Sequence, residues 1–120
     1  MEYPDKGYPT ADEAKPLNAW LTVRPLKGRA GLEVAGEVCL PTQPVWERAL
    51  EQVPRQQRAP YHLELSALTF IDVAGATALA VAAQNLGGGQ WLVLDSPPPA
   101  LTRLLELFWP DLSAIEVSAP

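Results

Sequence analysis

Cysteine and histidine are scarce in this chain of 120 residues, which contains one of each, Cys39 and His62. A single cysteine excludes an intramolecular disulfide, and it excludes a zinc site built from several cysteines. A single histidine leaves little material for a histidine-based metal or catalytic cluster. The composition therefore predicts a domain without a metal or cofactor, in which both residues have structural roles.

Basic residues and long apolar runs are also few. The chain has 9 Lys and Arg against 14 Asp and Glu, so its formal net charge is −5 and its isoelectric point is about 4.7. Nucleic acids and anionic membranes both require a basic surface, so neither is expected as a partner. No apolar run reaches the roughly 18 residues of a membrane-spanning helix. The first residues lack the apolar core of a secretory signal. We therefore expect a cytoplasmic protein with no direct membrane insertion.

The first 18 residues differ in composition from the rest of the chain. Residues 1–18 contain Pro4, Gly7, Pro9 and Pro16 among polar and charged residues, without apolar periodicity. This composition predicts a flexible lead-in. Residues 19–120 are numerous enough to bury a core without a disulfide or a metal, so we expect them to form a single domain.

The apolar periodicity of residues 19–120 predicts an α/β domain. Two strands, over 20–24 and 32–38, are expected to form a hairpin across the turn Lys27-Gly28. Three helix–strand units follow, with strands expected over 61–65, 91–94 and 115–117 and helices over about 43–53, 74–86 and 97–109. We expect Thr42 and Ser96 to cap the first and third helices, and Val45 and Phe108 to lie on their buried faces. Strand–helix alternation implies a mixed, mostly parallel sheet with crossover helices.

The junction between the third strand and the second helix is the most informative segment. The apolar residues Leu65, Leu68, Phe70 and Ile71 are expected to form a buried run that places Asp72 at the start of the helix. A carboxylate there meets unpaired backbone N–H groups and the positive end of the helix dipole. We therefore expect Asp72 to cap this helix, whose first residues are small.

Four motifs occur in the order and spacing of a known family. They are Gly36-Glu37-Val38-Cys39-Leu40, Leu65-Ser66-Ala67-Leu68-Thr69-Phe70-Ile71-Asp72, Gly75, and Asp95-Ser96-Pro97 followed by Leu101-Thr102-Arg103-Leu104-Leu105-Glu106-Leu107. With these motifs, residues 19–120 resemble a STAS domain, the fold of bacterial anti-sigma factor antagonists and of sulfate-transporter tails. The resemblance implies a STAS-like fold and a protein-interaction function.

The chain departs from this family at the positions that carry its regulation. Regulated antagonists commonly have Ser and then Ser or Thr after the aspartate, and the partner anti-sigma kinase phosphorylates one of them. Here these positions are Val73 and Ala74, which cannot accept a phosphate. The acidic residue of the first motif is replaced by Cys39, and a common leucine after Gly75 is replaced by Ala76.

The second helix suggests where a partner binds. Its expected outer face, which includes Ala74, Thr77, Ala78 and Val81, has no charge, whereas a solvated helix usually carries Lys or Glu. The resemblance adds the turn around Asp72 and the segment Glu37–Thr42. The expected partner-binding residues are therefore Asp72, Val73, Ala74, Gly75, Thr77, Ala78, Val81, Glu37 and Thr42. A homodimer or the N-terminal segment are alternative covers for this face.

Ser66, Thr69 and Thr77 are the hydroxyls nearest the turn, and they are the alternative phosphorylation sites that the sequence offers. No spacing in the sequence suggests a catalytic constellation, so an enzyme is not expected. By resemblance, the partner is an anti-sigma factor or a related kinase-like protein. Two alternatives remain: a STAS subunit that docks on the ATPase of an ABC-type lipid transporter, and a domain that senses a ligand at the turn.

Overall fold

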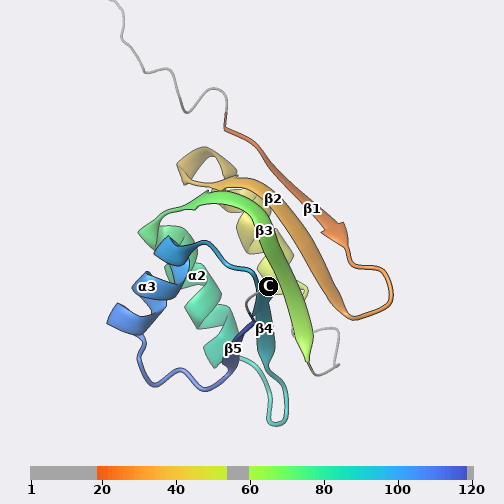
Figure 1. The fold of residues 1–120 in the computed structure, drawn as a ribbon, viewed down its shortest axis with the longest axis vertical. Helices are drawn as coiled ribbons and strands as arrows, with labels where there is room; N and C mark the ends of the chain where they lie inside the picture. The colour runs from red at the N-terminus through yellow and green to blue at the C-terminus, as the bar shows by residue number, and fades with distance from the viewer. Residues whose placement is uncertain (1–18, 54–59, 119–120) are drawn as a thin grey trace, which may run out of the picture.

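The structure is a computed structural model that describes residues 19–53 and 60–118. In these residues, five strands form one sheet in the order β1-β2-β3-β4-β5 (Figure 1). The strands are β1 (Leu21–Pro25), β2 (Gly31–Val38), β3 (Tyr61–Ile71), β4 (Leu92–Asp95) and β5 (Ile115–Ser118). The helices are α1 (Gln43–Glu51), α2 (Val73–Gln84) and α3 (Pro99–Phe108), and a short 3-10 turn, η2 (Leu40–Thr42), precedes α1.

The predicted α/β architecture is confirmed. β1 and β2 form an antiparallel hairpin, and the pairs β2–β3, β3–β4 and β4–β5 are parallel. A helix precedes each of β3, β4 and β5, as the crossover connections between parallel strands require. The expected lead-in, residues 1–18, lies outside the described residues.

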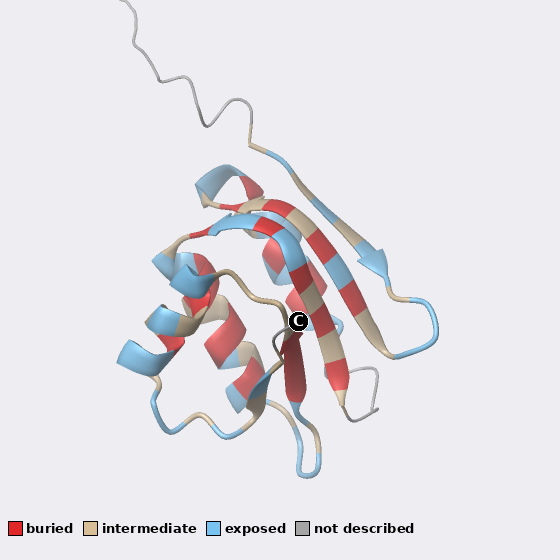
Figure 2. Ribbon diagram, viewed as in Figure 1, coloured by how far each residue is buried: buried red, intermediate tan, exposed pale blue. Residues whose placement is uncertain are grey.

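The core lies between the sheet and the helices. Buried and more exposed residues alternate along β2 and the first half of β3, because successive side chains of a strand point to opposite faces (Figure 2). The buried side chains form one cluster with Trp46 of α1, Leu79 of α2 and Leu101 of α3. β4, which lies between β3 and β5, is buried almost throughout.

β3 is longer and less regular than the sequence predicted. Its register against β2 shifts twice, between Glu33 and Ala35 and between Gly36 and Glu37 on the β2 side. Two extra β3 residues are accommodated in this way, so the buried positions change from every second residue to every third. This spacing turns Phe70 outward. The prediction that Phe70 is buried was therefore wrong: its side chain is 49% exposed.

The first turn of α2 is fixed by contacts with both neighbouring elements. Asp72 is the N-cap, and its Oδ1 accepts a hydrogen bond from the Gly75 N–H at 2.8 Å. The Asp72 N–H donates to the Val38 carbonyl at the end of β2, 3.1 Å away. The buried Trp46 indole donates from Nε1 to the Gly75 carbonyl at 2.9 Å. The expected capping role of Asp72 is thus confirmed.

The other two helices begin differently from the prediction. The Thr42 hydroxyl does not cap α1 but donates to the Glu37 carbonyl at 2.6 Å, which ties η2 to the end of β2. α3 begins at Pro99 with Pro98 as N-cap, so Ser96 caps no helix. Because a residue before proline avoids the helical region, the Pro97–Pro99 run delays the helix start.

Two residues expected on buried helix faces are exposed. α1 turns Trp46, Ala49 and Leu50 toward the core, which leaves Val45 on the solvent side. In α3 the buried positions are Leu101 and Leu105, and Phe108 at the end of the helix lies largely outside the core. The buried stripes are narrower than the sequence pattern suggested.

Trp46→Phe should destabilise the domain. The change removes the donor to the Gly75 carbonyl and leaves a gap in a fully buried region, so we expect the free energy of unfolding to fall by about 2–3 kcal/mol. Urea denaturation followed by far-UV circular dichroism measures this. Trp91→Phe, at a partly exposed position, is the matched control and should cost less than about 1 kcal/mol. Equal losses of unfolding free energy in the two variants would contradict the stabilising role given to the buried Trp46 indole.

Asp72→Ala should lower the free energy of unfolding by about 1 kcal/mol, because the N-cap acceptor is lost. Asp72→Asn keeps a side-chain oxygen at the same place and should remain within about 0.5 kcal/mol of the parent. The same denaturation measurement compares the two variants. If Asn were as costly as Ala, the charge of Asp72 rather than its hydrogen bond would stabilise the helix.

Candidate functional site

The candidate site lies where β2 and β3 end and α2 begins. The carboxyl ends of parallel strands are a common location for binding sites in α/β sheets. Here the end of β3 delivers Asp72, whose carboxylate is engaged by the Gly75 N–H. Beside it, Val73 is 53% exposed and Ala74 is exposed, so the first turn of α2 presents uncharged side chains.

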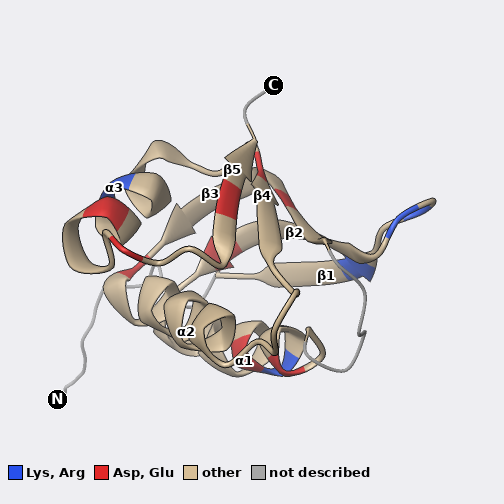
Figure 3. Cartoon of the chain, turned by 90° about the horizontal axis from the view of Figure 1, so that it is seen from below, with Lys and Arg blue, Asp and Glu red and all other residues tan. Residues whose placement is uncertain are grey.

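The outer face of α2 continues this uncharged surface. Figure 3 shows no Lys, Arg, Asp or Glu on α2. Gly75 is buried, Thr77 and Ala78 are partly buried, and Val81 is 45% exposed. Thr77, Ala78 and Val81 thus remain on the accessible side of the helix, whereas Gly75 and Ala80 lie on its buried side.

A shallow groove runs between α1 and α2. It has a volume of about 520 Å³ and is lined by Leu50, Ala78 and Val81, with Glu47 and Glu51 of α1 also among its walls. Its centre is apolar and its α1 side is acidic. The predicted outer-face residues Ala78 and Val81 thus belong to a recess rather than to a flat surface.

A second groove lies on the other side of the Asp72 turn, with a volume of about 640 Å³. Its lining includes Leu40 of η2, Phe70 of β3 and Asp72. Leu40 is 83% exposed, which is unusual for a leucine. Leu40 belongs to the predicted segment Glu37–Thr42, although it was not singled out there, whereas Phe70 was missed as a site candidate. The three-residue spacing of Leu65, Leu68 and Ile71 was the available sign that Phe70 faces outward.

The two ends of the predicted segment Glu37–Thr42 differ in their exposure. Glu37 is partly buried and lines the second groove. Thr42 is buried, and its hydroxyl also accepts a hydrogen bond from the Cys39 N–H at 3.0 Å. Thr42 therefore shapes the turn from inside and offers no side chain to a partner. Cys39 is partly buried, with Sγ 3.7 Å from Thr42 Oγ1.

The three candidate phosphorylation sites are not brought together. Ser66 lies in the middle of β3, where its N–H bonds to Glu64 Oε1 at 2.9 Å. Thr69 Oγ1 donates to the Gly36 carbonyl at 3.0 Å, and Thr77 Oγ1 donates to the Val73 carbonyl at 2.8 Å. Both threonine hydroxyls are thus engaged by backbone oxygens.

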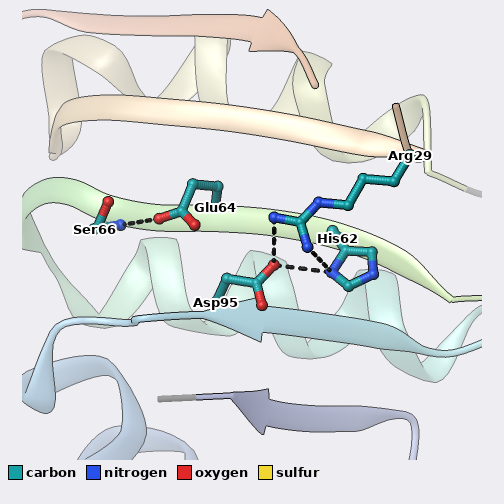
Figure 4. A network of polar contacts seen from close by, with 5 residues as sticks. All are labelled: Arg29, His62, Glu64, Ser66 and Asp95. Atoms are coloured by element: carbon teal, nitrogen blue, oxygen red, sulfur yellow. Dashed lines mark hydrogen bonds and ion pairs between the residues drawn. The ribbon is translucent and has the colours of Figure 1, made fainter. Parts of the chain in front are cut away.

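A polar cluster lies on the sheet face away from the helices (Figure 4). His62 Nδ1 is 2.8 Å from Asp95 Oδ2, and Arg29 Nη2 is 3.4 Å from the same oxygen. Arg29 comes from the β1–β2 turn, and His62 and Asp95 come from β3 and β4. The cluster joins three parts of the sheet, which agrees with a structural role for His62.

The described residues offer no group of three or more His, Cys, Asp or Glu that could hold a metal ion. Across the ranges 19–53 and 60–118, no helix has the length and apolar character needed to cross a membrane.

Comparison with known proteins agrees with the fold and with the motifs. A family model described as "Mlab, STAS domain" matches residues 22–109. The structure is similar to the crystal structure of an anti-sigma factor antagonist from Mycobacterium paratuberculosis, with a TM-score of 0.63 and 26% identity, covering 82% of this chain and 86% of that chain. No curated protein sequence matches the chain. Because the family model spans most of the chain, this protein belongs to the STAS domain family.

Proposed function

We propose that this protein is a non-catalytic regulator of the anti-sigma factor antagonist type, which binds an anti-sigma factor or a related kinase-like protein. Membership of the STAS family and similarity to a solved antagonist support a regulatory protein-interaction role. The single observation that carries the proposal is the uncharged, partly apolar surface around the Asp72 turn. We define this docking surface as Leu40, Phe70, Val73, Ala78 and Val81.

The chemistry of the docking surface suits a protein partner. A solvated helix usually displays charged side chains, whereas α2 has none on any face. Phe70, Val73 and Val81 are each about half exposed. Exposed apolar side chains that lie close together mark interaction sites more often than isolated ones do. Burying them against a partner would supply most of the binding free energy.

Acidic residues lie beside this apolar centre. Glu47 and Glu51 line the groove between α1 and α2, and Glu37 and Asp72 line the groove next to Phe70. An apolar centre with a charged periphery is the usual arrangement in protein interfaces. We therefore expect the partner to carry Lys or Arg around an apolar patch, which would accelerate association.

The regulation differs from that of phosphorylated antagonists. Val73 and Ala74 lie where those proteins have hydroxyl acceptors, and both are exposed at the start of α2. A kinase that docked here would find no acceptor at either position. We therefore propose that binding is constitutive with respect to phosphorylation at this turn, and that the protein acts in the cytoplasm.

The lack of an acceptor also favours a second candidate function. A STAS subunit that remains docked on the ATPase of an ABC-type lipid transporter has no need of a phosphorylation switch. It would use the same uncharged face of α2. The genes next to the one that encodes this chain separate the two: sigma and anti-sigma factors for the first function, transporter components for the second.

Val81→Glu should weaken partner binding at least about tenfold, because it places a carboxylate in the apolar groove of an already acidic surface. Isothermal titration calorimetry with the purified partner measures the change. Leu107→Glu, at an exposed apolar position on α3, is the control and should bind as the parent does. If Val81→Glu bound normally while remaining folded, the partner would dock elsewhere.

Val73→Ser and Ala74→Ser should restore a phosphorylation switch if the partner is an anti-sigma kinase. With ATP, we expect phosphate on at least one of the new serines and release of that variant, since a phosphate adds negative charge at an acidic surface. The parent should stay bound. Mass spectrometry and size-exclusion chromatography follow both effects. Phosphate on Ser66, Thr69 or Thr77 of the parent, with release, would contradict constitutive binding.

A further inference from the structure

We propose that the free edge of β5 is a second docking site, which accepts an extended segment of a partner protein with the pattern apolar–basic–apolar. This site lies at the end of the sheet formed by β4 and β5, not on the docking surface around Asp72. It follows from three observations: an open backbone edge, an apolar groove beside it, and acidic residues on both sides.

The backbone of β5 has hydrogen-bonding groups available for another strand. The Leu92 N–H donates to the Ala114 carbonyl at 2.8 Å, and the Ser96 N–H donates to the Ser118 carbonyl at 2.7 Å. Residues at even positions of this segment therefore direct their backbone toward β4. Since alternate residues of a parallel strand point their backbone to opposite sides, the N–H and C=O of Ile115 and Val117 point away from β4. In the described residues, no strand pairs with this edge.

The two edges of the sheet differ. β1, the opposite edge, includes Arg24 and Pro25, and both features oppose strand addition. β5 has no proline, its one charged residue is the acidic Glu116, and its Val117 side chain is 50% exposed. β5 is therefore the edge open to strand addition.

A groove next to β5 can receive the side chains of an added strand. It has a volume of about 400 Å³ and lies between α3, with Leu105 and the C-cap residue Trp109, and β5, with Ile115 and Val117. Successive side chains of an extended segment alternate between the two faces of the sheet. Two apolar side chains separated by one residue would thus enter this groove while the backbone pairs with β5, as in other modes of strand addition.

The acidic residues near β5 favour a basic residue between the two apolar residues of the partner segment. Glu116 is exposed and, by alternation, lies on the sheet face opposite the groove, in register with Val93. Glu106 of α3 lines the groove itself. A Lys or Arg between the two apolar residues would lie next to Glu116, and opposite charges on neighbouring strands stabilise pairing. A second copy of β5 would instead place another glutamate there, which disfavours self-pairing.

Amide hydrogen exchange by NMR tests the proposal with two synthetic peptides, one with the central run Thr-Val-Arg-Val-Thr and one with Thr-Val-Glu-Val-Thr. At saturation the Arg peptide should slow exchange of the Ile115 and Val117 amides at least about tenfold, because both amides become hydrogen-bonded. It should bind about five- to tenfold more tightly than the Glu peptide. No protection by the Arg peptide would overturn the proposal.

Two variants make the test specific. Val117→Pro removes an N–H that points away from β4, so the fold should persist while the Arg peptide no longer binds. Glu116→Lys should reverse the preference in favour of the Glu peptide. Unchanged preference in this variant would overturn the charge assignment, even if Val117→Pro failed to fold. Protection of Ile115 and Val117 that rises with protein concentration without peptide would show that a second copy occupies the edge, contrary to the proposal.

Discussion

The start of α2 can lie against the ends of β2 and β3 because residue 75 has no side chain. A Cβ at Gly75 would lie 2.5 Å from Val38 Cγ1 and 2.8 Å from Ile71 Cγ1, which is too close for atoms in contact. The approach lets Asp72 cap the helix and brings the Gly75 carbonyl within 2.9 Å of Trp46 Nε1. One glycine thus joins β2, β3, α1 and α2 at a single point.

The position of the proposed docking surface depends on these contacts at the first turn of α2. α2 is rich in alanine, so few large side chains fix its position on the sheet. The contacts at its first turn supply that restraint, which holds Val73 exposed at the start of the helix and Val81 in the wall of the groove between α1 and α2. The same restraint uses the Asp72 carboxylate and the Gly75 N–H, two groups that could otherwise bind a partner. We therefore propose that the exposed apolar side chains, rather than Asp72 itself, supply most of the recognition.

The order of strands and helices and the capping role of Asp72 could be predicted, because they depend on local periodicity and on the chemistry of helix ends. The exposure of Phe70 could not. It depends on two register shifts between β2 and β3. The apolar pattern of β3 alone does not show where its pairing with β2 becomes irregular. The exposure of Leu40 depends on the 3-10 turn that Thr42 holds from inside, whereas the sequence had suggested a helix cap. The start of α3 also differs from the prediction, because the prolines at 97–99 move it from the residue after Ser96 to Pro99.

The central claim is that a partner covers the uncharged face of α2 and the apolar side chains beside it. Cross-saturation NMR on the complex, with methyl groups of the domain observed while the partner is irradiated, tests this most directly. The account predicts strong attenuation at the methyl groups of Leu40, Val73, Ala78 and Val81, and none at Leu107 of α3. Attenuation confined to α3, or to the sheet face that carries His62 and Asp95, would contradict it.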